Sequence, residues 1–138
     1  MVFKSIVTGH FSKKYAKLTG KNKAFKQQVT NKMKGIRQNP EIGEPKSHDL
    51  RGLRGLHITE HYVIVYLIFN DYVIFINLDH HDKAYEATEG LMNRVLEDDR
   101  LLTELKQANI PTEEFARIIR TIGRRWGIRP FLSLSLKA

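Results

Sequence analysis

Two dense apolar runs, VIVYLIF and YVIFINL, constrain the fold of this chain more than any other feature. Both are rich in β-branched and aromatic residues, and Asn70-Asp71 between them is a two-residue turn typical of a β-hairpin. Because the runs are apolar at nearly every position, they predict central strands that are covered on both faces. Strand-like residues extend the first run toward the N-terminus, so the predicted strands occupy 56–69 and 72–78.

The N-terminal part of the chain predicts one strand followed by two helices. Residues 2–7 are largely β-branched or aromatic, whereas apolar residues recur at helical spacing over 11–18 and 22–38. Asn39-Pro40 ends the second helix, because a residue that precedes proline avoids the α conformation. Two amphipathic helices can cover one face of the hairpin, so the other face needs a further layer.

The C-terminal third predicts the helices that supply this layer. Leucine and valine residues over 91–105 indicate one helix, with a break near Asp98-Asp99. A second helix begins at Thr112, which can cap it directly after Pro111. The final residues alternate leucine with serine, so they could add a short strand or fray.

Length and composition bound the organisation of the chain. With 138 residues it is long enough for one domain with a core, and too short for two. We predict an α+β fold with residues 1–90 as its core and residues 91–138 as a helical extension packed on that core, in a single compact domain. Zero cysteines exclude disulfides and thiolate metal ligands. No apolar run reaches the roughly 20 residues that span a bilayer and no secretion signal opens the chain, so we expect a cytoplasmic protein without membrane contact.

The positive charge is concentrated in the first third. The net charge is +8, but residues 1–54 contain 13 Lys and Arg against 3 Asp and Glu, whereas residues 55–90 contain 1 against 6. A basic segment of this kind favours an anionic partner, of which nucleic acid is the commonest. The alternative is a solvated basic helix face without a partner.

Five of the six histidines lie between Lys46 and Tyr85, beside the predicted strands. An ordinary histidine pKa near ~6.5 lets the ring both take and give a proton at neutral pH, so this stretch is a candidate acid–base site. His57 and His61 are four residues apart and would project from one face of a regular strand. His81 follows the neighbouring strand and could end near them. Either histidine alone could also be an ordinary hydrogen-bonded surface residue.

The order of these elements, together with the block HDLRGLRGLHITEHYVIVYLIFNDYVIFINLDHHDKAY, resembles the RelE/ParE toxin superfamily, and most of all its YafQ-type branch. The resemblance covers roughly residues 1–88. It implies a RelE-like fold, an antiparallel twisted sheet with two N-terminal helices packed on it, to which this chain adds a C-terminal helical extension. It also implies an mRNA endoribonuclease that acts on the ribosome and is silenced by a cognate antitoxin.

The resemblance assigns individual positions. The residues at the family's histidine and closing aromatic positions are His48, His57, His81 and Tyr85. Tyr62 stands where YafQ-type proteins carry a tryptophan, so an aromatic is kept there. Three features depart from the family. His61 stands where YafQ-type proteins carry an aspartate, Val63 stands where RelE-type members carry an arginine, and the chain extends past Gly90.

Metal-free RNA cleavage needs a base for the 2′-hydroxyl proton, a cation for the charged phosphate and an acid for the leaving 5′-oxygen. We predict His81 as the general acid and His48 or His57 as the general base, while Tyr85 orients or stacks on a base. The predicted RNA- and phosphate-binding residues are Lys46, Arg51, Arg54, His61 and Tyr62.

A metal site is the alternative use of the last two histidines. His80-His81, flanked by Asp79 and Asp82, could hold Zn²⁺ or Ni²⁺, since imidazole and carboxylate groups bind both ions. Adjacent residues of a strand point to opposite faces, however, and rarely share one ion. We therefore expect neither a metal site nor a cofactor.

Two other functions fit the same fold. Val63 in place of an arginine favours a non-catalytic protein that binds a protein or RNA partner, as the gyrase-directed ParE branch does, although the retained histidines argue against it. The chain could also be an inactive relative whose C-terminal third covers the cleft as a lid.

Overall fold

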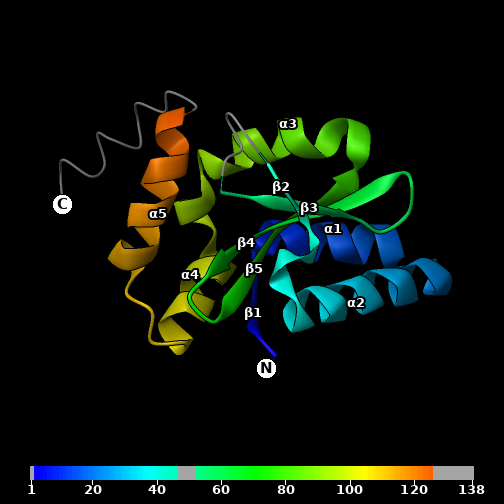
Figure 1. Ribbon diagram of the computed structural model, residues 1–138, viewed down its shortest axis with the longest axis horizontal. Coiled ribbons are helices and arrows are strands. Elements are labelled where there is room, and N and C mark those ends of the chain that lie inside the picture. The colour runs from blue at the N-terminus through cyan, green and yellow to red at the C-terminus, as the bar shows by residue number, and fades with distance from the viewer. Residues whose placement is uncertain (1, 47–51, 126–138) are drawn as a thin grey trace.

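The computed structural model of the chain describes residues 2–46 and 52–125 and is built around one five-stranded sheet (Figure 1). The strands are ordered β1-β5-β4-β3-β2 across the sheet. Along the chain the elements are β1 (Lys4–Val7), α1 (Gly9–Thr19), α2 (Lys23–Gln38), η1 (Pro40–Ile42), β2 (Glu44–Pro45), β3 (Arg54–His57), β4 (Tyr62–Phe69), β5 (Tyr72–His80), α3 (His81–Met92), η3 (Val95–Glu97), α4 (Asp99–Gln107) and α5 (Thr112–Arg125).

The predicted hairpin is confirmed as the centre of the sheet. Strands β4 and β5 pair antiparallel from Phe69–Tyr72 to Tyr62–His80. Asn70 closes the turn with a φ of 54°, a left-handed conformation that asparagine tolerates. The sheet is not wholly antiparallel, because β1 lies parallel to β5 at one edge, with Lys4 opposite Tyr72.

The prediction of a single strand over 56–69 is wrong, because the segment folds into β3 and β4 with a turn between them. The backbone N–H of Ile58 donates to the carbonyl of Tyr62 over 2.9 Å, which closes this turn. The N–H of His61 donates to the hydroxyl of Thr59 over 3.1 Å. These hydrogen bonds within the turn satisfy backbone N–H groups that, in a continuous strand, would have to bond to a neighbouring strand.

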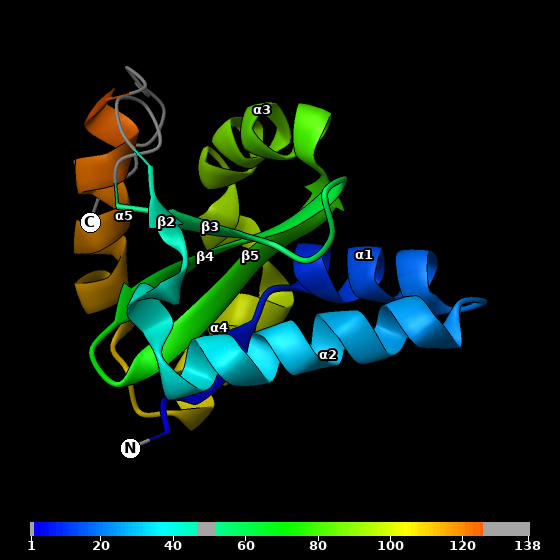
Figure 2. The ribbon, with the colours of Figure 1, turned by 45° about the vertical axis from the view of Figure 1, so that its right-hand side comes forward.

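Both faces of the sheet are covered, as the apolar strands predict (Figure 2). Helices α1 and α2 pack on one face, where Phe11, Phe25, Val29 and Ile36 are buried. The other face is covered by α3 and the C-terminal elements. Their buried residues there are Ala84, Met92, Val95, Leu101, Leu105, Ile110, Phe115 and Ile119. The second layer that the apolar strands require is therefore present, and both α3, which begins at His81, and elements of the C-terminal third contribute to it.

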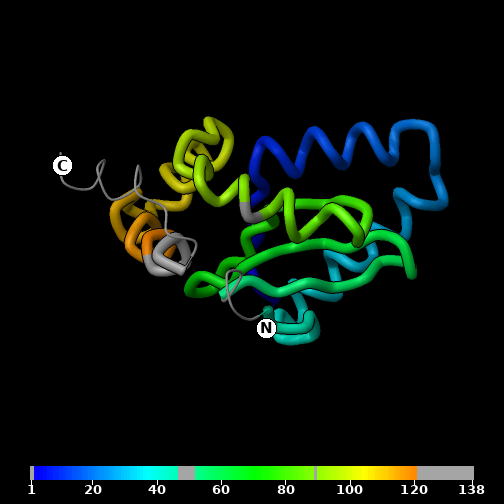
Figure 3. The backbone as a smooth tube through the Cα atoms, turned by 90° about the horizontal axis from the view of Figure 1, so that it is seen from above, coloured from blue at the N-terminus to red at the C-terminus, as the bar shows by residue number. Residues whose placement is uncertain are grey.

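The C-terminal elements are hydrogen-bonded to the N-terminal ones as well as packed on the sheet. The prediction of one helix over 91–105 is wrong, because α3 ends at Met92 and η3 lies between it and α4. Helix α4 does begin at the predicted break, where Asp98 caps it by accepting the N–H of Leu101 over 2.9 Å. The same carboxylate accepts the N–H groups of Gly9 and His10 at the start of α1. Figure 3 shows α5 at the end of the molecule opposite the turn that joins α1 to α2.

Helix α5 begins at Thr112, as predicted. The predicted tail strand over 128–138 lies outside the described residues. Within the described part of the chain, no helix combines the length and the apolar character that crossing a membrane requires.

Candidate active site

Four histidines meet where the central hairpin ends and α3 begins. His57 is the last residue of β3, His61 precedes β4, His80 ends β5 and His81 starts α3. The backbone N–H of His81 donates to the carbonyl of His61 over 2.7 Å. This bond, together with the pairing of Tyr62 with His80, holds three of the four histidines in a fixed backbone frame.

The imidazole rings lie within contact distance of one another. The ring centroids of His57 and His81 are 6.2 Å apart, those of His61 and His80 are 5.8 Å apart, and those of His61 and His81 are 6.5 Å apart. The His80 and His81 rings are stacked with centroids 4.9 Å apart. His57 and His61 are exposed, whereas His80 and His81 are half-buried.

The route by which the histidines converge differs from the predicted one. His57 and His61 do not share a strand face, because the turn between β3 and β4 separates them. Nor does strand alternation apply to His80 and His81, since the strand ends at His80 and the helix starts at His81. His80 serves as N-cap, and its Nδ1 accepts the N–H of Asp82 over 3.3 Å.

Asp82, in the first turn of α3, orients the adjacent rings. One of its carboxylate oxygens lies 3.1 Å from Nδ1 of His81, and the other lies 3.4 Å from Nδ1 of His80. A proton on Nδ1 of His81 is then held by the carboxylate, so Nε2 is the atom that can exchange a proton with a substrate. These contacts are partly exposed to solvent, so they position the ring more than they add stability.

Tyr85 and Lys46 form a second part of the site on the same helix. Tyr85 lies one turn after His81 on α3, and Nζ of Lys46 is 4.4 Å from the centroid of its ring. The phenol oxygen of Tyr85 is buried and has no hydrogen-bond partner among the described residues. A Cβ at Gly55 would collide with this oxygen and crowd Lys46. The absence of a side chain at Gly55 therefore leaves the space that the side chains of Tyr85 and Lys46 occupy.

Two of the predicted RNA-binding residues face the other side of the sheet. Arg54 precedes Gly55 on β3, so its side chain points to the face opposite the one where Gly55 meets Tyr85. Its Nη1 donates to the carbonyls of Glu41 and Gly43 over 3.2 and 2.8 Å. Tyr62 packs between the rings of Phe25 and His80, at centroid distances of 4.9 and 5.6 Å. Both side chains therefore have contacts within the fold on the face that α2 covers.

Val63, at the arginine position of RelE-type proteins, is fully buried. It lies opposite His57 in the β3–β4 register and belongs to the core beneath α3. No cation at this position can reach a phosphate. Two predicted site residues, His48 and Arg51, lie outside the described residues.

A polar connection that the sequence did not predict runs from α1 through the core to the site helix α3. Asn77 is fully buried in β5, and its amide nitrogen donates to the carbonyl of Ala84 and the hydroxyl of Thr88 on α3. Its amide oxygen lies 3.0 Å from Nε2 of His10. Burial lowers the pKa of His10 below its ordinary value, and Lys14 adds to this while Asn77 opposes it. The signal in the sequence was the single asparagine within the otherwise apolar run YVIFINL.

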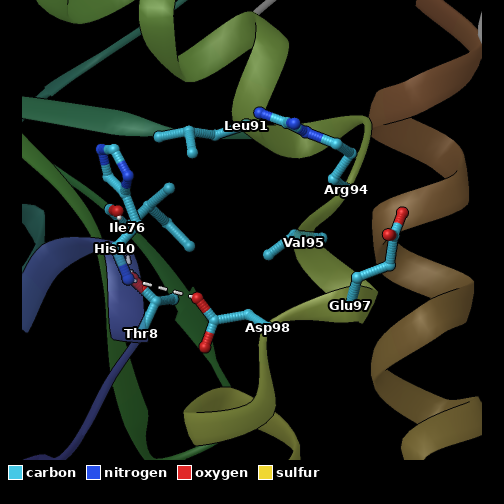
Figure 4. Close-up of a pocket in the computed structure, with 8 residues that line it drawn as sticks. All are labelled: Thr8, His10, Ile76, Leu91, Arg94, Val95, Glu97 and Asp98. Atoms are coloured by element: carbon cyan, nitrogen blue, oxygen red, sulfur yellow. Dashed lines mark hydrogen bonds between the residues drawn. The ribbon is translucent and has the colours of Figure 1, made fainter.

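A pocket of about 250 Å³ lies beside this connection, and its lining includes His10 but none of the four clustered histidines (Figure 4). It is lined by Thr8, His10, Ile76, Leu91, Arg94, Val95, Glu97 and Asp98. The carboxylate of Asp98 is engaged by the backbone of α1, as the dashed line marks. The predicted catalytic residues that the structure describes, His57, His81 and Tyr85, do not line this pocket.

Comparison with known proteins agrees with this architecture. The family model of the ParE toxin of the type II toxin–antitoxin system parDE matches residues 7–85. RelE4 of Methanocaldococcus jannaschii, a RelE-family protein, is 33% identical over 72 residues, which are 51% of this chain and 77% of that protein.

Solved structures show the same fold. The YoeB/ParE toxin from Agrobacterium tumefaciens aligns with a TM-score of 0.52 at 18% identity, over 56% of this chain and 98% of the other. The toxin–antitoxin complex RelBE2 from Mycobacterium tuberculosis aligns with a TM-score of 0.51 at 19% identity, over 58% and 92%. Elements η3, α4 and α5 lie beyond the residues that the family model matches. The chain belongs to the ParE toxin family of type II toxin–antitoxin systems, within the RelE/ParE superfamily.

Proposed function

We propose that this protein is an endoribonuclease that cleaves messenger RNA on the ribosome by histidine acid–base chemistry, without a catalytic metal ion. The observation that carries the proposal is the pairing of His57 with His81, whose ring centroids are 6.2 Å apart on the side of the sheet where Tyr85 and Lys46 also lie. A phosphodiester placed between two imidazoles meets a proton acceptor on one side and a proton donor on the other.

In this mechanism His57 takes the proton of the 2′-hydroxyl, and the 2′-oxygen attacks phosphorus. The bond from phosphorus to the 5′-oxygen breaks, and His81 gives that oxygen a proton from Nε2. The products are a 2′,3′-cyclic phosphate and a 5′-hydroxyl. Asp82 holds the opposite nitrogen of His81, which keeps Nε2 directed outward. His48 is the alternative base.

Lys46 is the cation that we assign to the developing phosphate charge. Its side chain is 19% exposed and lies against the ring of Tyr85, with Nζ 3.7 Å from the carboxylate of Glu44. Binding of a phosphate would replace the exposed Glu44 as its partner. Tyr85 would then stack on or orient the adjacent base. Because Val63 offers no cation, we expect a slower enzyme than one with an additional arginine.

The experiment is expression of the protein in a translating extract, followed by mapping of transcript ends. We expect cleavage within translated regions that leaves 5′-hydroxyl ends. Transcripts that stay intact while the protein is folded and free of antitoxin would overturn the proposal.

We also propose a cognate antitoxin as the protein partner, and a place in the YafQ-type branch of the superfamily. Support for the antitoxin comes from the family itself and from the related toxin in the RelBE2 toxin–antitoxin complex. The basic surface of the first third, with ten more Lys and Arg than Asp and Glu, favours acidic or nucleic-acid partners.

The burial of Val63 favours a second candidate, a non-catalytic toxin that binds a protein or RNA target. Growth arrest that persists unchanged in a His57→Ala, His81→Ala double variant would support this function. The lid hypothesis has less support, because His57 and His61 are exposed and the described residues of the extension do not cover them.

A further inference from the structure

The turn before β4, the end of β5 and the start of α3 bring three imidazoles to one point. His61, His80 and His81 each offer a ring nitrogen, and these three atoms all lie within 4.8 Å of one another. The backbone bond from His81 to His61 and the pairing of His80 with Tyr62 fix their relative positions. The ligand atoms are therefore gathered by the fold before any ion binds.

We infer that His61, His80 and His81 form a binding site for a borderline transition-metal ion such as Zn²⁺ or Ni²⁺. These ions prefer imidazole nitrogen, at about 2.0–2.1 Å for zinc, which puts two ligands of a tetrahedral ion about 3.4 Å apart. The three nitrogen atoms lie within 4.8 Å of one another, so binding an ion requires a small rotation of the side chains to bring them to this spacing. His61 is exposed and its neighbours are half-buried, so the rings have room to turn.

Carboxylates stand where supporting groups of a metal site are expected. Asp82 lies 3.1 Å from Nδ1 of His81, and a carboxylate at one ring nitrogen fixes the tautomer that binds metal through the other. Glu60 lies 3.3 Å from Nε2 of His61 and can either support that ring or supply a fourth ligand. Three imidazoles with a remaining position open to water or to Glu60 satisfy the coordination of zinc.

This site shares His81 with the proposed nuclease, and its consequence for activity rests on that proposed function. A metal ion on Nε2 of His81 occupies the lone pair and the position of the proton that the general acid must donate. The ion would therefore inhibit RNA cleavage. The activity of the toxin would then fall as the concentration of free transition metal rises. The binding itself does not depend on catalysis.

The binding test uses the untagged full chain, freed of metal by a chelator, and titration with zinc chloride alone by calorimetry. We expect each protein molecule to bind one zinc ion in a saturable manner. His61→Asn and His80→Asn should each weaken it by more than about tenfold, the range reached by loss of even a supporting partner. His57→Asn, outside the three-ligand group, should retain it. The asparagine at position 80 keeps a side chain that can cap α3.

Absence of a saturable equivalent, or equal weakening by His57→Asn, would overturn the metal site. Circular dichroism of each variant shows that the protein titrated is folded. The activity arm then compares cleavage with zinc present and with zinc chelated. Zinc should inhibit the native chain and not His80→Asn. If cleavage is absent even when zinc is chelated, the proposed nuclease function is wrong. The calorimetric titration tests the zinc site separately, because zinc binding does not require RNA cleavage.

Discussion

The carboxylate of Asp98 accepts the backbone N–H of Gly9 over 2.8 Å, although 89 residues separate them in the chain. The same side chain accepts the N–H of Leu101, so one carboxylate caps the first turn of α1 and the first turn of α4. Helix N-termini leave such N–H groups without partners inside the helix, and a carboxylate also complements the helix dipole. Asp98 thus links the C-terminal extension by hydrogen bonds to residues 7–85, the part of the chain that the ParE family model matches.

Asp98→Ala should lower the free energy of unfolding by about 2 kcal/mol. The N-cap of α4 is worth about 1 kcal/mol, and the hydrogen bonds that Asp98 accepts from the N–H groups of Gly9 and His10 add about 1 kcal/mol more. Asp98→Asn is the matched control. It keeps one acceptor oxygen of the same shape and should cost less. Urea denaturation of the three proteins measures the difference. Equal stability of Asp98→Ala and the native chain would show that the double cap contributes nothing.

Truncation after Gly90 should abolish cooperative folding. It removes five fully buried side chains of the core, Met92, Leu101, Leu105, Phe115 and Ile119. Together these are worth about 8–15 kcal/mol, at about 1.5–3 kcal/mol each. That range matches the whole stability of an ordinary domain, about 5–15 kcal/mol. Thermal unfolding followed by circular dichroism checks this. A truncated protein that folds and cleaves RNA faster would instead support the lid.

Stability should fall on acidification in a way that depends on His10. Burial lowers its pKa in the folded state, so the unfolded chain binds a proton more readily. The contribution of His10 is therefore fully present above its ordinary pKa of about 6.5, and it is lost as the pH falls from there toward the lower folded value.

His10→Gln isolates this effect, because its amide can still donate to Asn77 but does not titrate. Denaturation midpoints at pH 7.5 and 5.5 should differ less for the variant than for the native chain. All other residues are the same in both proteins, so the comparison isolates position 10. An identical pH dependence would contradict the assignment of a half-buried His10 with a lowered pKa.

Gly55→Ala should disturb the site through a single contact. The new Cβ would meet the phenol oxygen of Tyr85, so the fold must shift at a cost of about 1–3 kcal/mol. In a Tyr85→Phe background this oxygen is absent, and the same substitution should cost less. A double-mutant cycle of unfolding free energies measures the coupling. Additive effects would mean that Gly55 and Tyr85 do not meet as described.

Much of the fold follows from the sequence because it depends on local periodicity. The hairpin around Asn70, the two N-terminal helices and the start of α5 at Thr112 all have local signals, and the structure confirms them. The need for a second layer follows from strands that are apolar on both faces. This expectation is confirmed by the burial of residues such as Leu101 and Phe115.

What could not be predicted depends on where one element ends and the next begins. The turn at Thr59 removes His57 and His61 from the common strand face that alternation predicts. The helix start at His81 brings its ring beside that of His80, although alternation would have placed the two on opposite faces. The resemblance indicated His57, His81 and Tyr85 as site residues, but it did not indicate that His80 joins the group. Long-range links such as His10 to Asn77 leave no periodic signal at all.

The most direct measurement compares mRNA cleavage rates in a purified translating system, with zinc chelated, for the native chain, His81→Ala and His80→Asn. If His81 is the general acid, its loss should slow cleavage by about 10²–10⁴-fold. His80→Asn, which removes the adjacent ring but keeps the helix cap, should cleave at close to the native rate. Equal cleavage by the native chain and a folded His81→Ala variant would contradict the account.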